Sequence, residues 1–185
     1  MGQRSEVLAA QYEQVLSQLE EAVRGCSDQK WSAICGDEGW TVAATAHHLG
    51  AQLPLEKEYL VAAAEGMQMP AYSWDDINAR NAKHAQEFSA AGKADTLEVI
   101  RTNGSAMAAW VRGLSDEQTG PPCVPLALAG GAQVTTQQLI EGGVKHPRGR
   151  VSRPIQVEAG LDLVRAVGTH EAVCYALGRC VTTSL

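Results

Sequence analysis

The chain has 185 residues, of which 45% are hydrophobic and 19% are charged. These proportions are typical of one folded domain with a sizeable core, since a domain of roughly 150 residues buries about two thirds of its unfolded surface. The formal net charge of −6 argues against a nucleic-acid-binding protein. A local basic run interrupts this acidic character, and we interpret it as a solvated face: Lys145, Arg148, Arg150 and Arg153.

Neither a secretory leader nor a membrane span is expected. The first residues lead directly into an amphipathic pattern, and no run reaches the ~18 apolar residues of a membrane span. The cysteines are odd in number and scattered, without a CxxC pair that would suggest a redox or zinc motif. They favour free thiols in a reducing cytoplasm: Cys26, Cys35, Cys123, Cys174 and Cys180.

Helical spacing of apolar residues predicts a first helix over residues 5–24, with Gly25 at its end. A second helix is predicted from Thr41, whose hydroxyl can cap it, to about Ala64. Pro54 lies inside this helix and removes a hydrogen bond to the carbonyl of Gly50. We therefore expect a kink there and not a stop.

Two further helices have recognisable starts. Ser73 and Asp76 form a predicted capping box, and the inward face of that helix carries two polar residues, Asn81 and His84. Asp95 with Glu98 is expected to open the next helix, whose apolar residues are spaced three and four apart. Within it, Gly104 is expected to let a neighbouring backbone come close.

Residues 119–131 predict a loop or short hairpin, because they combine prolines and glycines. Helix is expected to resume near Thr135, with a second glycine–proline kink before Pro147. The end of the chain is the least legible part. A helix is assigned to 157–167, and Val173–Val181 alternates like a strand.

Two histidines are the first candidates for chemistry. His48 falls next to the apolar stripe of its helix, so its ring is expected to face the interior, whereas His47 is turned roughly 100° away. His146 lies at the predicted end of another helix, beside the second kink. Imidazoles on two packed helices suit a metal site. The alternatives are a core histidine satisfied by a hydrogen bond for His48, and a dipole-stabilised histidine for His146.

Other polar residues give weaker signals. Asn81 and His84 could line a pocket, with His84 as a further ligand, or could simply satisfy each other. Carboxylates and thiols elsewhere have structural readings as well, as helix-terminal charges or small buried side chains: Asp37, Glu38, Cys35 and Cys123. No nucleophile elbow, phosphate loop or His-Glu-x-x-His motif is present in the sequence.

The order and spacing of four segments resemble the DinB/YfiT-like superfamily, close to the branch named for the N-terminal domain of mycothiol-dependent maleylpyruvate isomerase. The resemblance covers about residues 5–150. The matching segments are Trp40 to Leu49, Ser73 to Asn81, the helix from Asn103 to Gln118, and Val134 to Pro147.

The resemblance implies an all-α, up-down-down-up four-helix bundle over residues 1–150, with an extra short helix. It also implies a divalent metal, often zinc or nickel, held by three histidines. His48 matches the first ligand and His146 the second, but the place of the third is taken by Arg150. A guanidinium cannot bind a cation, so metal binding is expected to be weak or absent. After Gly149 the likeness ends, which suggests a shifted reading frame or a replaced terminus in the divergent segment 151–185.

Two functions from different classes follow from the resemblance. The first is a cytoplasmic, metal-dependent enzyme of thiol-transferase or isomerase type, or a hydrolase-like one, acting on a small molecule with a low-molecular-weight thiol such as mycothiol. The second is a degenerate, metal-free binding or structural protein. Either is expected to be a homodimer without nucleic-acid or membrane partners. His170 is a further candidate nitrogen ligand without an assigned role.

Overall fold

The computed structural model describes residues 2–35, 39–120, 124–129 and 131–145. The described part is mainly helical, which confirms the all-α class. Within these ranges six helices have ten or more residues: α1 (Gln3–Gly25), α3 (Val42–Ala51), α4 (Leu53–Ala64), α5 (Trp74–Glu87), α6 (Lys93–Gly113) and α8 (Thr136–Lys145). The short elements are α2 (Asp28–Trp31), α7 (Asp116–Thr119), the 3₁₀ turn η1 (Ala127–Ala129), and strands β1 (Ile34–Cys35), β2 (Trp40–Thr41), β3 (Val124–Leu126) and β4 (Ala132–Val134).

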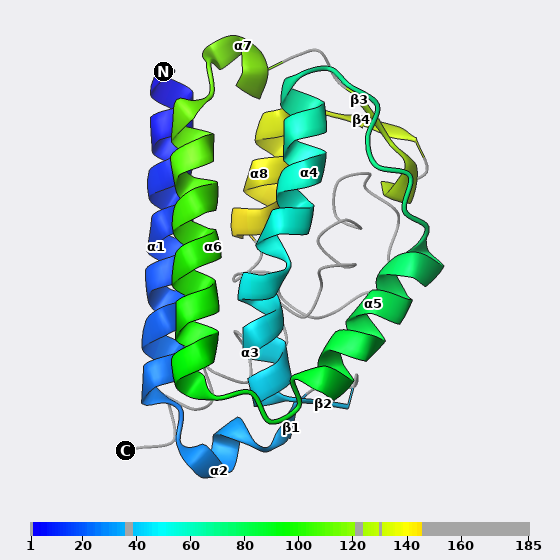
Figure 1. Cartoon of the computed structure of the whole chain (residues 1–185). Helices are drawn as coiled ribbons and strands as arrows, with labels where there is room; N and C mark the ends of the chain where they lie inside the picture. The colour runs from blue at the N-terminus through cyan, green and yellow to red at the C-terminus, as the bar shows by residue number, and fades with distance from the viewer. Residues whose placement is uncertain (1, 36–38, 121–123, 130, 146–185) are drawn as a thin grey trace, which may run out of the picture.

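The long helices lie side by side. Figure 1 shows α1 and α6 running in opposite directions along one side of the molecule, with α3 and α4 following each other beside α6. α8 contacts both α1 and α4. α5 diverges from these helices and packs on α3 at the end where β1 and β2 pair. The up-down-down-up order of a complete bundle stays a prediction, because α8 is described only to Lys145.

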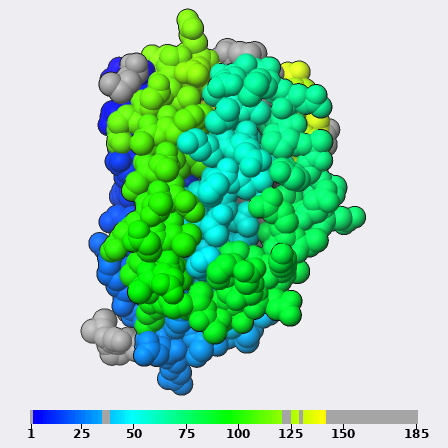
Figure 2. Space-filling view, viewed as in Figure 1, coloured from blue at the N-terminus to red at the C-terminus, as the bar shows by residue number. Residues whose placement is uncertain are grey.

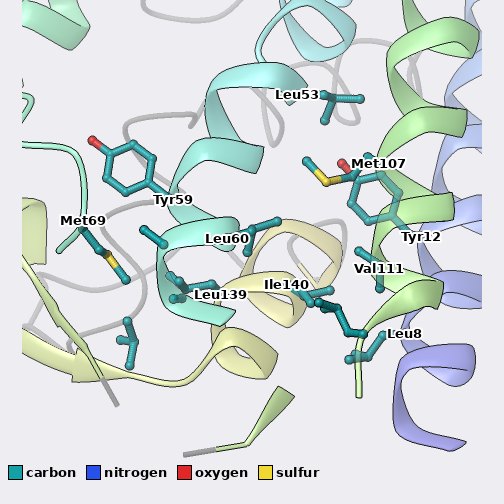
Figure 3. Close-up of a cluster of buried hydrophobic side chains, with 14 of the residues drawn as sticks. Leu8, Tyr12, Leu53, Tyr59, Leu60, Met69, Met107, Val111, Leu139 and Ile140 are labelled. Atoms are coloured by element: carbon teal, nitrogen blue, oxygen red, sulfur yellow. The ribbon is translucent and has the colours of Figure 1, made fainter. Parts of the chain in front are cut away.

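The first helix is the one predicted from periodicity, extended by a residue or two at each end. Its buried face includes Leu8, Tyr12, Leu19 and Val23, which recur four or seven residues apart. These side chains join two hydrophobic clusters. The larger cluster unites α1, α4, α6 and α8, and Figure 3 shows labelled side chains from those helices together with Met69 from the segment after α4.

The predicted kink at Pro54 is a break between α3 and α4. Thr41 caps α3, as expected, by accepting a hydrogen bond from the Ala44 N–H at 3.1 Å. A single residue, Gln52, separates the two helices, and Pro54 lies in the first turn of α4. Proline cannot donate to the Gly50 carbonyl, so Asn103 of α6 donates its side-chain N–H to that oxygen instead, at 3.0 Å.

Close approach between helices occurs at Gly50 and not at Gly104. A Cβ added to Gly50 would lie 2.8 Å from the backbone nitrogen of Ile100, so only glycine lets α3 approach the α6 backbone there. At Gly104 the added Cβ would meet the side chain of Leu16, at 2.5 Å. The expectation that Gly104 admits a neighbouring backbone is therefore wrong.

The starts of α5 and α6 differ in how well the sequence predicts them. Ser73 and Asp76 form the predicted capping box, with each residue bonded to the backbone of the other. The predicted opening of α6 at Asp95 is wrong, because α6 begins at Lys93 and Gly92 is its N-cap. Asp95 lies in the first turn, where its charge favours the helix dipole.

The glycine- and proline-rich stretch contains the predicted hairpin. β3 and β4 pair antiparallel, with Val124 opposite Val134. The next helix resumes as predicted: Thr135 accepts a hydrogen bond from the Gln138 N–H, and α8 follows. None of the helices in the described ranges is long and apolar enough to cross a membrane.

Several predictions lie outside the described residues. They are the second kink at Pro147, the helix over 157–167, the alternating segment Val173–Val181, and the boundary at 150 between a bundle and a divergent segment. His146, Arg150 and His170 lie outside as well.

Candidate functional site

His48 is a buried residue of α3. Its side chain has a relative exposure of 0%, as expected for an inward-facing ring. The amide nitrogen of Gln52, one turn later, donates to His48 Nδ1 at 3.2 Å. His48 Nε2 is buried and has no hydrogen-bond partner among the described residues. Since buried polar atoms are almost always paired, this nitrogen is the atom of the site that most needs a ligand.

Aromatic rings surround His48. Trp40, on β2 just before the α3 cap, meets the His48 ring edge to face, with centroids 5.2 Å apart and planes at 86°. His84 of α5 lies on another side, with centroids 4.9 Å apart and planes at 72°. These neighbours exclude water from the ring and fix its orientation. The structure thus places His84 next to His48, one of the arrangements that the sequence analysis had left open.

His47 forms an imidazole cluster with His48 and His84, although its position on the helix predicted that it faces away from His48. Its exposure is only 6%, because α5 covers this side of α3. His47 Nδ1 lies 3.3 Å from His84 Nε2. Phe88 stacks on the His47 ring at a centroid distance of 3.9 Å and an interplanar angle of 13°. In Figure 2, α3 and α4 form a narrow strip between α6 and the residues around α5.

All three imidazoles are biased toward the neutral form. Burial, helped by the neighbouring imidazoles and Arg80, lowers the pKa of His48 to about 3. Burial and the charge of His47 lower the pKa of His84 to about 4, although a hydrogen bond to the Ala44 backbone raises it. Burial also lowers the pKa of His47. Neutral imidazole is the form that binds metal ions, so no proton must be displaced from a cation before ligation.

Two polar residues that follow His48 along α3 and α4 were not predicted from the sequence. Gln52 and Glu56 follow His48 at intervals of four, which places all three on one face of α3 and α4. Burial raises the pKa of Glu56 to about 7. That carboxyl in turn contributes to the raised pKa of Tyr12, after burial of the phenol itself. The available signal was this polar row inside an otherwise apolar stretch.

The other predicted site residues are dispersed or undescribed. Asn81 is half-buried on the face of α5 that carries His84. Cys26 is buried, and its thiol donates a hydrogen bond to the Ser27 carbonyl at 3.6 Å. Within the described ranges no three His, Cys, Asp or Glu side chains form a group that could hold a metal ion. The remaining candidates lie outside the described side chains: His146, Arg150, His170, Asp37, Glu38, Cys35 and Cys123.

A pocket of 490 Å³ lies elsewhere, between the segment that follows α4 and the β3–β4 hairpin. Its described lining consists of uncharged residues, including Met67 and Met69. Without an acid, a base or a charge, this lining has no group for proton transfer or ion binding. The imidazole cluster is therefore the candidate site.

Comparison with known proteins identifies the family. The sequence model of the DinB superfamily matches residues 11–150, which include His48, His84 and His146. Searches of curated proteins and of solved structures found no significant match. Because the match spans well over half of the chain and agrees with the helical fold, the chain belongs to the DinB superfamily.

Proposed function

We propose that this chain is a metal-dependent enzyme of thiol-transferase or isomerase type, in which His48 and His146 hold a divalent zinc or nickel ion. The observation that carries the proposal is His48 Nε2, a buried ring nitrogen with no hydrogen-bond partner in the part of the chain that the structure describes. A low-molecular-weight thiol such as mycothiol is the proposed co-substrate, from the resemblance to the maleylpyruvate isomerase branch. A small molecule is the proposed substrate.

The residues around His48 fit a metal ligand. Its ring is neutral because burial lowers its pKa. Its other nitrogen, Nδ1, is hydrogen-bonded to Gln52, and such an outer contact is what orients ligating histidines. A ring proton on Nδ1 with the Gln52 amide turned to accept it leaves the Nε2 lone pair free for a metal.

A bound zinc or nickel ion would lower the pKa of a coordinated thiol or water and so supply a nucleophile at neutral pH. Trp40 and His84 would keep water from the His48 side of the site, since both rings pack against the imidazole. Asn81 and His84 would face a substrate from α5. Affinity is expected to be low, because Arg150 stands where the family has its third histidine.

A metal-free binding or structural protein is the second candidate function, and Arg150 is the observation that favours it. A guanidinium near His48 and His146 would repel a cation. In that case Nε2 of His48 would form a hydrogen bond with an organic ligand, either as the acceptor or as the donor.

Metal content and thiol binding test the proposal together. The protein, purified without chelators, is expected to hold less than one zinc or nickel per chain by elemental analysis, and to take up nickel on addition. Adding a thiol such as cysteine to the nickel-loaded protein should produce a thiolate-to-nickel charge-transfer absorption band. The band should be missing in His48→Gln. A protein that takes up no metal and gives no band at millimolar nickel would leave the metal-free candidate.

We also propose, from family likeness, a cytoplasmic homodimer formed through the helices. The cysteines are odd in number and scattered along the sequence, which favours a reducing compartment. Sedimentation equilibrium at micromolar concentration is expected to give the mass of two chains. A clean monomer would remove the dimer from the proposal.

A further inference from the structure

We propose that His47 and His84 form a second binding site for a divalent transition metal, on α3 and α5, distinct from the site of His48 and His146. Zinc and nickel are the ions that suit two imidazole nitrogens. The inference goes beyond the proposed function and does not rest on it, because neither His47 nor His84 is a ligand in that proposal.

The separation of the two nitrogens fits ligands of one ion. His47 Nδ1 and His84 Nε2 lie 3.3 Å apart. Two nitrogens at 2.0–2.1 Å from a tetrahedral zinc are themselves about 3.3–3.4 Å apart. The ring centroids, 5.1 Å apart and tilted by 32°, agree with two imidazoles that share an ion. A direct hydrogen bond would normally be shorter, at about 2.7–3.2 Å.

Both rings are held in place from outside the pair. Phe88 stacks on His47 and also lies against His84, at centroid distances of 3.9 and 4.6 Å. His84 has a hydrogen bond to the backbone of Ala44, and this is the type of outer contact that fixes a ligating imidazole. The helices are tied together nearby, because Thr41 Oγ1 donates to the Ser89 carbonyl at 2.7 Å. Little rearrangement is needed before an ion binds.

Two carboxylates offset part of the cost of burying a cation at this position. Burial lowers the pKa of His47, whereas the charges of Asp95 and Glu87 raise it. His84 is half-buried, so an ion can reach the pair from solvent and keep water molecules as its remaining ligands. Two protein ligands make the site weaker than a closed structural zinc site.

The experiment titrates zinc into the full-length His146→Gln chain by calorimetry. This variant removes a ligand of the family site and leaves the buried His48 intact. One zinc per chain is expected. A further His84→Gln or His47→Gln substitution should weaken binding about tenfold or more. Asn78→Gln, at an exposed position of α5, is the control and should leave the affinity unchanged. Circular dichroism melts check that each variant is folded.

Imidazole ¹⁵N spectra of the unmodified chain provide a second measurement that needs no variant. Zinc should shift the signals of His47 Nδ1 and His84 Nε2. Binding in the His146→Gln chain that His84→Gln and His47→Gln leave unchanged would overturn the inference, as would the absence of binding. If only the site of His48 and His146 fails to bind zinc, the result is distinguishable. Zinc then still shifts the signals of His47 Nδ1 and His84 Nε2 and leaves the signal of His48 Nε2 unchanged.

Discussion

The side-chain amide of Gln52 donates a hydrogen bond to Nδ1 of His48 at 3.2 Å, inside the protein. In this hydrogen bond Nδ1 is the acceptor. The neutral ring therefore carries its proton on Nε2, which has no partner among the described residues. Metal binding at Nε2 requires the other tautomer, in which Nδ1 holds the proton. Gln52 can serve both states, because rotating its amide presents the oxygen in place of the nitrogen.

Substitution of Gln52 is therefore expected to change metal affinity. In Gln52→Glu the carboxylate can only accept, so it favours the proton on Nδ1 and a free lone pair on Nε2. Affinity for zinc should rise about tenfold. Gln52→Met, which offers no strong acceptor, should lower it. Calorimetric titration compares the three chains, and equal affinities would show that Gln52 does not set the tautomer.

The bond from Asn103 to the Gly50 carbonyl compensates for Pro54. Asn103→Ala should cost about 1–2 kcal/mol of unfolding free energy, because it leaves a carbonyl of α3 without a donor. In a Pro54→Ala background the restored backbone N–H can bond the same carbonyl, so the cost should fall. Urea unfolding of the four chains measures this coupling. Asn78→Ala, at an exposed position of α5, is the control.

Gly50 is predicted to be the least replaceable glycine among those in the described helices. An alanine Cβ would lie 2.8 Å from the Ile100 nitrogen and 2.9 Å from its Cα, and backbone atoms cannot move aside cheaply. Gly50→Ala should lower the unfolding free energy by about 2 kcal/mol or more. Gly113→Ala, where nothing lies within 4 Å, should be neutral or stabilising. Equal effects in thermal melts would contradict the close approach of α3 to α6.

The raised pKa of Glu56 predicts that the free energy of unfolding falls toward alkaline pH. Its pKa is raised from 4.5 to about 7 in the folded protein by burial. The folded state thus prefers the protonated carboxyl, so the contribution is complete below pH 4.5 and is lost as the pH rises through about 7. Because the side chain is partly exposed, we expect a difference of about 2 kcal/mol.

Glu56→Gln removes this dependence, so it should be more stable than the parent chain at pH 8 and similar to it at pH 4. Urea unfolding at the two pH values measures the effect. Glu65→Gln changes an exposed carboxylate at the end of the same helix and serves as the control. If the Glu56→Gln variant loses as much stability between pH 4 and pH 8 as the parent chain does, the assignment to Glu56 is wrong.

The main helices of this fold could be predicted from the sequence because each has a local signal. Thr41 and Ser73 act as caps where their positions predicted them, and α8 begins next to Thr135, where helix was expected to resume. The start of α6 could not be predicted in the same way, since Gly92 offers no side-chain oxygen and Asp95 resembles a cap. The Gly104 prediction was wrong because spacing alone does not say whether a backbone or a side chain fills the space.

The candidate site was predicted only in part. His48 was identified because its ring follows the apolar stripe of α3. The burial of His47 depends on the direction of α5, which diverges from the other helices, and helical periodicity carries no information on that direction. The role of Gln52 depends on how far it lies from His48 through the helix break. His146 and Arg150 stay predictions.

The most direct test of the proposed metal site is a calorimetric titration of zinc and nickel into the Arg150→His variant. The titrated chain also carries His84→Gln, which removes the second proposed site, that of His47 and His84. Restoring the third histidine should raise affinity about tenfold or more over the same chain with Arg150. His48→Gln should abolish that gain, because His48 supplies the ligand nitrogen on α3. Tight binding by the chain that keeps Arg150, abolished by His48→Gln and unchanged by Arg150→His, would contradict the assigned ligand set.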